Sequence, residues 1–154
     1  MKTEYKKASA GSARPELTIC DAADQIGMAL EQASAVLNLL VNDCFDGDPF
    51  KSGSEAALCS LALVSALLDQ ADDALDVLAP SLPMHSGREL QHLLQRLAGL
   101  VRLLECNADN TPTTQVFVAA SLALQLAEQA KADAYACWLA RSGRDEGEPR
   151  DADN

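Results

Sequence analysis

The chain has 154 residues, a natural length for one domain, and it is 48% apolar but only 4% aromatic. Alanine and leucine supply most of the apolar residues, which favours helix packed on helix over a sheet, because strands prefer β-branched and aromatic residues. A formal net charge of −11 argues against DNA, RNA and anionic membranes as partners, since each of these binds positive protein surfaces.

The two ends of the chain differ in composition from its middle. Residues 1–17 mix lysine and arginine with serine, alanine, glycine and proline, and they lack the apolar stretch of a signal peptide. We predict a disordered N-terminal tail over 1–17, a helical bundle domain over 18–140 and a disordered acidic C-terminal tail over 141–154. Five cysteines without a C-x-x-C pair predict a reducing, cytoplasmic location. The residue usage, rich in alanine, leucine and aspartate and poor in lysine, is typical of a protein from a high-GC bacterium or one of its phages.

The first predicted helix spans residues 19–44. Its apolar residues recur in alternating steps of four and three, which places them on one helical face. Asp21 lies in the first turn, where the helix dipole favours an acid. The sequence Asp-Gly-Asp-Pro at 46–49 ends the helix. The expected buried face consists of Ile19, Ala23, Ile26, Leu30, Ala33, Leu37, Leu40 and Cys44.

The second and third predicted helices follow the same pattern. The second begins near Ser52 or Ser54, since Ser52 and Glu55 have capping-box spacing, and prolines at 80 and 83 end it. Its expected buried residues are Ala57, Leu61, Val64, Leu68, Ala71, Leu75 and Leu78. The third begins at Ser86, where Glu89 offers another capping box. Its expected buried residues are Leu90, Leu94, Leu97, Val101 and Leu104.

The fourth predicted helix starts with Thr111 as its N-cap and Pro112 in the first helical position. Strand propensity competes over 113–118, but the helical spacing continues through this stretch. The expected buried face consists of small residues with one valine: Val116, Ala120, Ala123, Ala127, Ala130, Ala134 and Cys137.

Short connections between four helices predict an all-α, up-down-up-down four-helix bundle. One end, which we name end A, gathers the start of the first and third helices and the end of the second and fourth. The opposite end is end B. A faint similarity between the second and fourth helices, with Leu61 aligned on Ala120 and Leu68 on Ala127, is also compatible with two stacked helical hairpins.

Acidic residues gather on one face of the second predicted helix. Four aspartates recur there with helical spacing near the C-terminal end, where carboxylates oppose the helix dipole and repel one another. A plain solvated face would explain them. As a functional hypothesis, they form an acidic patch for a basic partner: Asp69, Asp72, Asp73 and Asp76.

Parts of the second and fourth helices are apolar nearly all round, as in the runs AALCSLALVSALL and VFVAASLALQLA. Helices of this kind are normally buried. The excess of apolar surface therefore predicts that these two helices either are central in the fold or form an interface, with a homodimer as the first candidate. Leu58, Phe117 and Val118 are the predicted partner-binding residues of this surplus. Tyr135 and Trp138 lie three residues apart in the last turns and are expected to cover the core, with the anchoring of a partner as the alternative.

Cysteine and histidine offer a different chemistry. A zinc site can be drawn at end A from Cys20, His85, His92 and Cys137, and a thiol group at end B from Cys44, Cys59 and Cys106. Zinc ligands usually come in close local pairs, whereas these come from separate segments. Cysteine on the buried face of a helix is more often a small apolar filler. We therefore expect no metal and no cofactor.

No catalytic motif stands out, and the leading hypothesis is a non-enzymatic protein–protein interaction module: an adaptor, a small chaperone or an inhibitor. It would act through apolar helix faces and the acidic patch. The first alternative is a helical bundle that binds a small ligand or a metal, or senses redox state, through cysteine and histidine. The second is an acidic decoy of a nucleic-acid-binding protein, whose affinity for a basic partner falls with salt.

Overall fold

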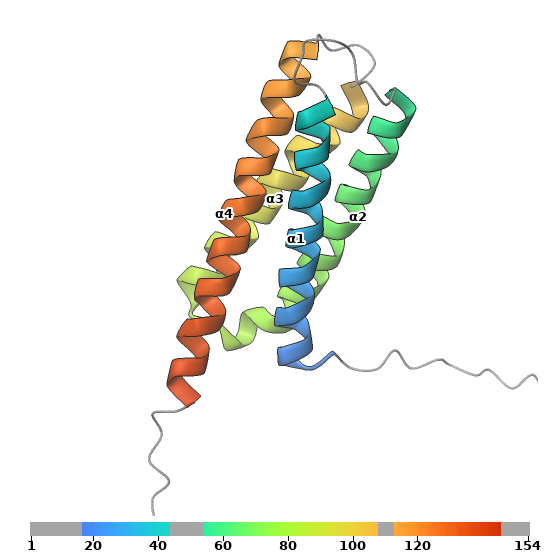
Figure 1. The fold of residues 1–154 in the computed structure, drawn as a ribbon. Coiled ribbons are helices and arrows are strands. Elements are labelled where there is room, and N and C mark those ends of the chain that lie inside the picture. Colours follow the sequence, from blue (N-terminus) through green and yellow to red (C-terminus); the bar gives the residue numbers. More distant parts are fainter. Residues whose placement is uncertain (1–16, 44–53, 108–112, 146–154) are drawn as a thin grey trace, which may run out of the picture.

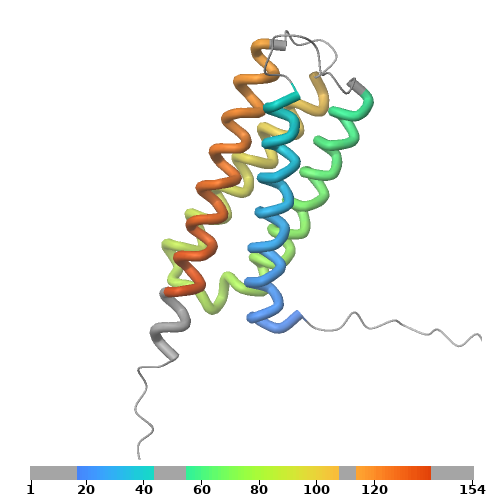
Figure 2. Tube along the Cα trace, viewed as in Figure 1, coloured from blue at the N-terminus to red at the C-terminus, as the bar shows by residue number. Residues whose placement is uncertain are grey.

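The computed structural model describes residues 17–43, 54–107 and 113–145, and within them the chain forms four long α-helices (Figure 1). They are α1 (Ile19–Asp43), α2 (Ser54–Leu78), α3 (Met84–Asn107) and α4 (Thr113–Asp145), with a short 3₁₀ turn η1 (Ala79–Ser81) between α2 and α3. Successive helices run antiparallel, and the tube in Figure 2 follows the chain up, down, up and down. The predicted all-α four-helix bundle is confirmed.

The helices stand at the four corners of a bundle. α1 contacts α2 and α4, and α3 contacts the same two helices, so α1 lies diagonal to α3 and α2 lies diagonal to α4. The pairs α1–α2 and α3–α4 form two antiparallel hairpins, which stack through α1 against α4 and α2 against α3. The α1–α2 contact is the most extensive of the four.

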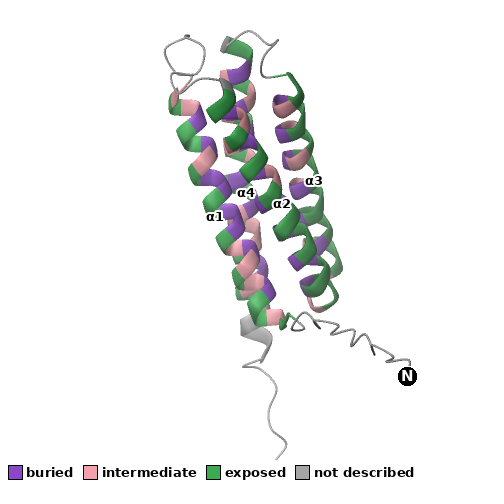
Figure 3. Ribbon diagram, turned by 90° about the vertical axis from the view of Figure 1, so that its right-hand side faces the viewer, coloured by how far each residue is buried: buried purple, intermediate pink, exposed green. Residues whose placement is uncertain are grey.

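Each helix buries one face toward the centre of the bundle (Figure 3). All predicted core positions of α2 and α3 are buried, as are Val116, Ala120 and Ala123 of α4. The inner face of α4 consists mainly of alanine, so α1, α2 and α3 provide most of the large core side chains. The largest fully buried ones are Ile26, Leu30, Leu37, Leu61, Leu68, Leu90, Leu94, Leu97, Val64 and Val101.

Local hydrogen bonds define the start of α1. Thr18 Oγ1 accepts a hydrogen bond from the backbone amide of Asp21 (3.2 Å), and Asp21 Oδ2 accepts one from the amide of Thr18 (3.3 Å). This reciprocal pair is a capping box with aspartate in the place usually taken by glutamate. It satisfies two amides that the first turn would otherwise leave without partners.

The predicted start of α3 is wrong by two residues. α3 begins at Met84, because the carbonyl oxygen of Pro83 already accepts the first helical hydrogen bond, from the amide of Gly87 (3.1 Å). Ser86 therefore lies inside the first turn and does not cap it. Glu89 instead faces His85 along the helix, with 3.2 Å between Oε1 and Nε2.

The ends of α1, α2 and α4 fall partly outside the described residues. α1 is described up to Asp43, so its predicted end at Cys44 lies outside the described residues, as do the predicted caps at Ser52 and Thr111. α4 continues to Asp145, five residues past the end predicted at 140, so the acidic C-terminal segment begins within this helix. The predicted N-terminal tail lies outside the described residues up to position 16.

Candidate functional site

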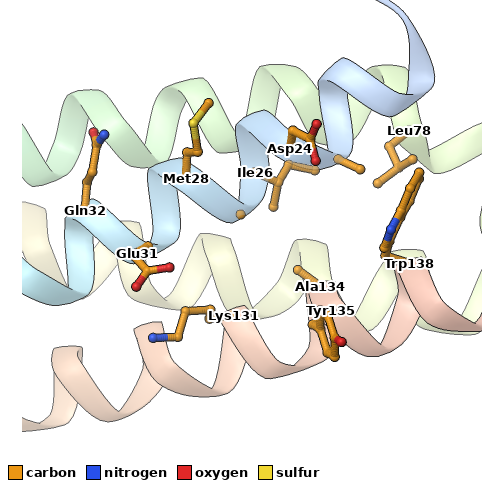
Figure 4. A pocket seen from close by; sticks show the side chains of 12 residues that line it. Asp24, Ile26, Met28, Glu31, Gln32, Leu78, Lys131, Ala134, Tyr135 and Trp138 are labelled. Atoms are coloured by element: carbon orange, nitrogen blue, oxygen red, sulfur yellow. The ribbon is translucent and has the colours of Figure 1, made fainter.

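A hollow between α1 and α4 near end A brings together aromatic, apolar and charged side chains (Figure 4). Its volume is about 500 Å³. A second, more open hollow of about 420 Å³ continues from it toward the middle of the two helices, and both are lined by Glu31 and Lys131. We name this continuous depression the α1/α4 groove. The residues lining it are Ala23, Asp24, Ile26, Gly27, Met28, Glu31, Gln32, Ser34, Ala35, Asn38, Leu78, Leu124, Glu128, Lys131, Ala134, Tyr135 and Trp138.

Small residues open the deep end of the groove. Ala23 of α1 and Ala134 of α4 were predicted to be buried, but both are only half-buried because they line this hollow. Gly27 lies one helical turn from Ala23 on α1 and also lines the hollow, and a Cβ atom placed on it would meet no atom within 4 Å apart from its chain neighbours and its own helix backbone. Large side chains at these positions would fill the space, so the three small residues account for the cavity.

Apolar side chains form the wall of the deep end. Ile26 and Leu78 reach it from the core, and Trp138 extends from α4 across the end of the groove toward Leu78 (Figure 4). Tyr135 and Met28 form the rim and are mostly exposed, at 64% and 61%. Aromatic and apolar side chains around a concave space are typical of binding sites.

Polar side chains occupy the middle of the groove. Lys131 Nζ lies 2.9 Å from Glu128 Oε2 and 3.1 Å from Glu128 Oε1, one turn away on α4. The hydrogen bond from Lys131 lowers the pKa of Glu128 below its ordinary value. Glu31 of α1 faces Lys131 from the other side of the groove (Figure 4).

Ser34 is the one polar side chain among the described residues that is buried without a hydrogen bond. Its side chain is on α1, the residue is only 4% exposed, and Oγ has no acceptor or donor in hydrogen-bonding geometry. The hydroxyl contributes to the lowered pKa of Glu128, after the larger effect of Lys131, although the two groups are not in hydrogen-bonding geometry. A buried hydroxyl without a partner destabilises the protein. Because Ser34 lines the groove, a bound partner is one group that could supply the missing hydrogen bond.

The sequence did not identify this groove. Tyr135 and Trp138 were expected to cover the core, whereas they line the deep end of the groove on the side of α1. One signal was available: Lys131, Tyr135 and Trp138 follow each other at helical spacing beside the alanine face of α4. That row adjoins the core without belonging to it. Only the packing of α1 against α4 shows that this row of side chains faces a groove.

The predicted acidic patch lies elsewhere in the bundle. Asp69, Asp72, Asp73 and Asp76 are all exposed on α2, which is diagonal to α4. Arg102 of α3 approaches Asp69 with 3.5 Å between Nη2 and Oδ1, and Arg88 lines a small surface hollow together with Asp76. The arginines of α3 therefore compensate part of the negative charge, although exposed pairs of this kind stabilise by less than about 1 kcal/mol.

The raised pKa of Asp72 leads to a prediction of how stability depends on pH. Partial burial first, and then the charges of Asp76, Asp73 and Asp69, raise its pKa above the ordinary value. A carboxyl whose pKa is raised by folding destabilises the folded state at neutral pH, and this effect disappears as pH falls through the raised pKa to the ordinary value of 3.8. We expect Asp72→Asn to stabilise the protein by about 0.3–0.5 kcal/mol at pH 7.

Thermal unfolding of wild type and Asp72→Asn at several pH values between 7 and 3.5 measures this effect. The gain in melting temperature should shrink as the pH falls. Gln70→Asn, on the same helix and also exposed, is the control without a change of charge. A gain that stays constant with pH would mean that electrostatic repulsion is not its origin.

The predicted apolar interface does not form one surface. Leu58 of α2 and Phe117 of α4 are half-buried, and Phe117 packs against the core, whereas Val118 is 64% exposed. α2 and α4 occupy diagonal corners, so their outer faces point to different sides of the bundle. Large exposed apolar side chains occur on all four helices: Met28, Leu39, Leu63, Val77, Met84, Leu103, Val118, Leu122, Tyr135 and Leu139.

None of the cysteines and histidines that the structure describes lines the α1/α4 groove. Cys20, Cys59 and Cys106 are exposed free thiols, while Cys137 is buried and its pKa is raised, first by burial and then by Asp133. His85 and His92 are exposed on α3. Within the described part of the chain, no three metal-ligating side chains are grouped to hold an ion. Cys44 lies outside the described residues.

Comparison of the chain with family models, with curated proteins and with solved structures finds no match. Among the described helices, none has both the length and the apolar character needed to cross a bilayer.

Proposed function

We propose that this chain is a non-enzymatic binding module whose α1/α4 groove receives the apolar face of a helix from another protein. The observation that supports this most directly is the cavity of about 500 Å³ with Ile26, Leu78 and Trp138 in its wall. From Ala23 to Asn38 the groove follows α1 for 15 residue steps, about 22 Å at 1.5 Å per residue. A partner helix of about four turns would cover that length, as in other helix-in-groove complexes.

Charge favours a foreign, basic helix over a second copy of the chain. Each copy carries a net charge of −11, so two copies repel each other. The groove is itself acidic, because Asp24, Glu31 and Glu128 outnumber Lys131. An adaptor, a small chaperone and an inhibitor would all use such a surface.

The groove also supports this function better than the alternatives. A metal- or redox-sensing bundle would need cysteine or histidine at the cavity, and the lining residues include neither. An acidic decoy would use the aspartates of α2, where Arg102 already pairs with Asp69. The groove combines a cavity, aromatic side chains and acceptors for a basic partner in one place.

The test uses a displayed library of 18-residue helical peptides, with the residues on one face randomised, selected against the purified protein. Trp138 is the only tryptophan of the chain, so its fluorescence reports binding in the groove. We expect the selected peptides to share large apolar residues on one face and to change this fluorescence. Gly27→Leu should weaken their binding at least about ten-fold, because the leucine side chain fills the open space at Gly27.

Gly99→Leu is the matched control. Gly99 is also a helical glycine with open space at its Cβ position, but it lies on α3, away from the groove. Leucine is a better helix former than glycine, so both variants should fold. If the selected peptides bind Gly27→Leu as tightly as wild type, the proposed site is disproved. A homodimer in light scattering that Gly27→Leu splits into monomers would identify a second copy as the occupant and also disprove the proposal.

A further inference from the structure

We infer that the α1/α4 groove selects a partner helix with a lysine or arginine about two turns away from its main apolar residue. This inference rests on the proposed function and adds the chemistry of the partner. It follows from the separation of the groove into an apolar end and a polar middle, and from the side chains that the polar middle offers.

The spacing follows from positions along α1. The α1 residues that line the deep hollow run from position 23 to 32, with Gly27 near the middle of that range, and those that line the second hollow run from 31 to 38, with Ser34 near the middle. Ser34 lies seven residues after Gly27. Seven residues span about 10.5 Å, or two helical turns, and both positions line the α4 side of α1. A helix lying along α1 that inserts an apolar side chain at Gly27 therefore presents its residue seven positions away at Ser34. This holds for either direction of the partner helix.

The polar middle of the groove accepts hydrogen bonds more than it donates them. Glu31 and Glu128 bring two carboxylates, while Lys131 brings one ammonium group and already pairs with Glu128. The local balance is negative, so an incoming cation neutralises it and an incoming carboxylate would face two like charges. Asn38 can add its side-chain oxygen to the acceptors.

Ser34 provides the second, independent observation. Its hydroxyl lines this part of the groove and is buried without a hydrogen bond. An ammonium or guanidinium group that reaches Oγ would donate a hydrogen bond to its lone pairs, whereas an apolar side chain at this position would leave the hydroxyl unsatisfied. The unpaired Ser34 hydroxyl and the excess of carboxylates over ammonium groups both favour a cationic side chain of the partner.

The experiment uses two synthetic peptides built from a sequence selected for Gly27-dependent binding. One carries arginine seven residues from the apolar anchor and the other carries glutamine at that position. Titration calorimetry measures the affinity of each peptide for wild type and for the variants Glu31→Gln, Ser34→Ala and Glu55→Gln. Glu31 and Glu55 are both exposed, but Glu55 lies on α2, so its variant controls for the loss of one negative charge anywhere on the protein.

We expect wild type to bind the arginine peptide at least about ten-fold more tightly than the glutamine peptide. Glu31→Gln and Ser34→Ala should each reduce this preference several-fold, and Glu55→Gln should leave it within about two-fold. Equal binding of both peptides to wild type, with binding still lost in Gly27→Leu, would overturn this inference and leave the proposed function intact. If no helical peptide binds in the groove, the proposed function fails and this inference fails with it.

Discussion

Replacing Leu97 by alanine is expected to lower the free energy of unfolding by about 2–5 kcal/mol. Leu97 is at the middle of α3 and has no exposed surface. The change removes buried apolar atoms and leaves a cavity that the surrounding helices fill only partly. We expect the protein to remain helical but to unfold at a clearly lower denaturant concentration.

The composition of the core makes this loss large. α4 offers Ala120, Ala123, Ala127 and Ala130 on its buried face, and these side chains are too small to move into a new space. The core therefore depends on the leucines of the other three helices. Because interiors are packed to a density close to that of organic crystals, one missing isobutyl group leaves its neighbours without contacts.

Urea unfolding followed by circular dichroism measures the effect of Leu97→Ala. Leu103→Ala, on the same helix but 63% exposed, is the matched control and should change the unfolding free energy by less than about 1 kcal/mol. Equal losses in the two variants would mean that the inner face of α3 has been assigned incorrectly.

Replacing Trp138 by alanine is expected to weaken a groove-binding peptide at least about 30-fold. An aromatic side chain that forms the wall of a binding pocket often accounts for 2 kcal/mol or more, and 1.4 kcal/mol is a ten-fold change in the dissociation constant. Trp138 closes the deep end of the groove opposite Leu78, so the substitution removes the largest side chain of the cavity wall. Titration calorimetry is the measurement, because the variant has no tryptophan to report binding.

Leu139→Ala is the control for Trp138→Ala. Leu139 is the next residue of α4 and is 52% exposed, but it does not line the groove. Both variants should keep their helical content, which circular dichroism verifies before titration. An unchanged affinity in Trp138→Ala, or an equal loss in Leu139→Ala, would contradict the role of the groove in binding.

The sequence was sufficient to predict the helices and most of the core, because the apolar spacing of a helix is local information. Steps of four and three residues identified buried positions such as Leu37, Leu68 and Val101 without any knowledge of their neighbours. The end of α2 was also readable from Pro80, since the helix ends at Leu78. The start of α3 was not, because the Pro83 carbonyl and the Ser86–Glu89 pair offered competing starts, and the structure uses the carbonyl.

The tertiary structure alone decided where the candidate site lies. Whether Ala23 and Ala134 are packed or line a cavity depends on how closely α1 approaches α4, and no residue spacing within one helix contains that distance. The isolation of Ser34 Oγ likewise depends on which atoms of α4 come near it. Helix periodicity therefore determined which face of each helix turns inward, while packing between helices determined where that inward face was left open.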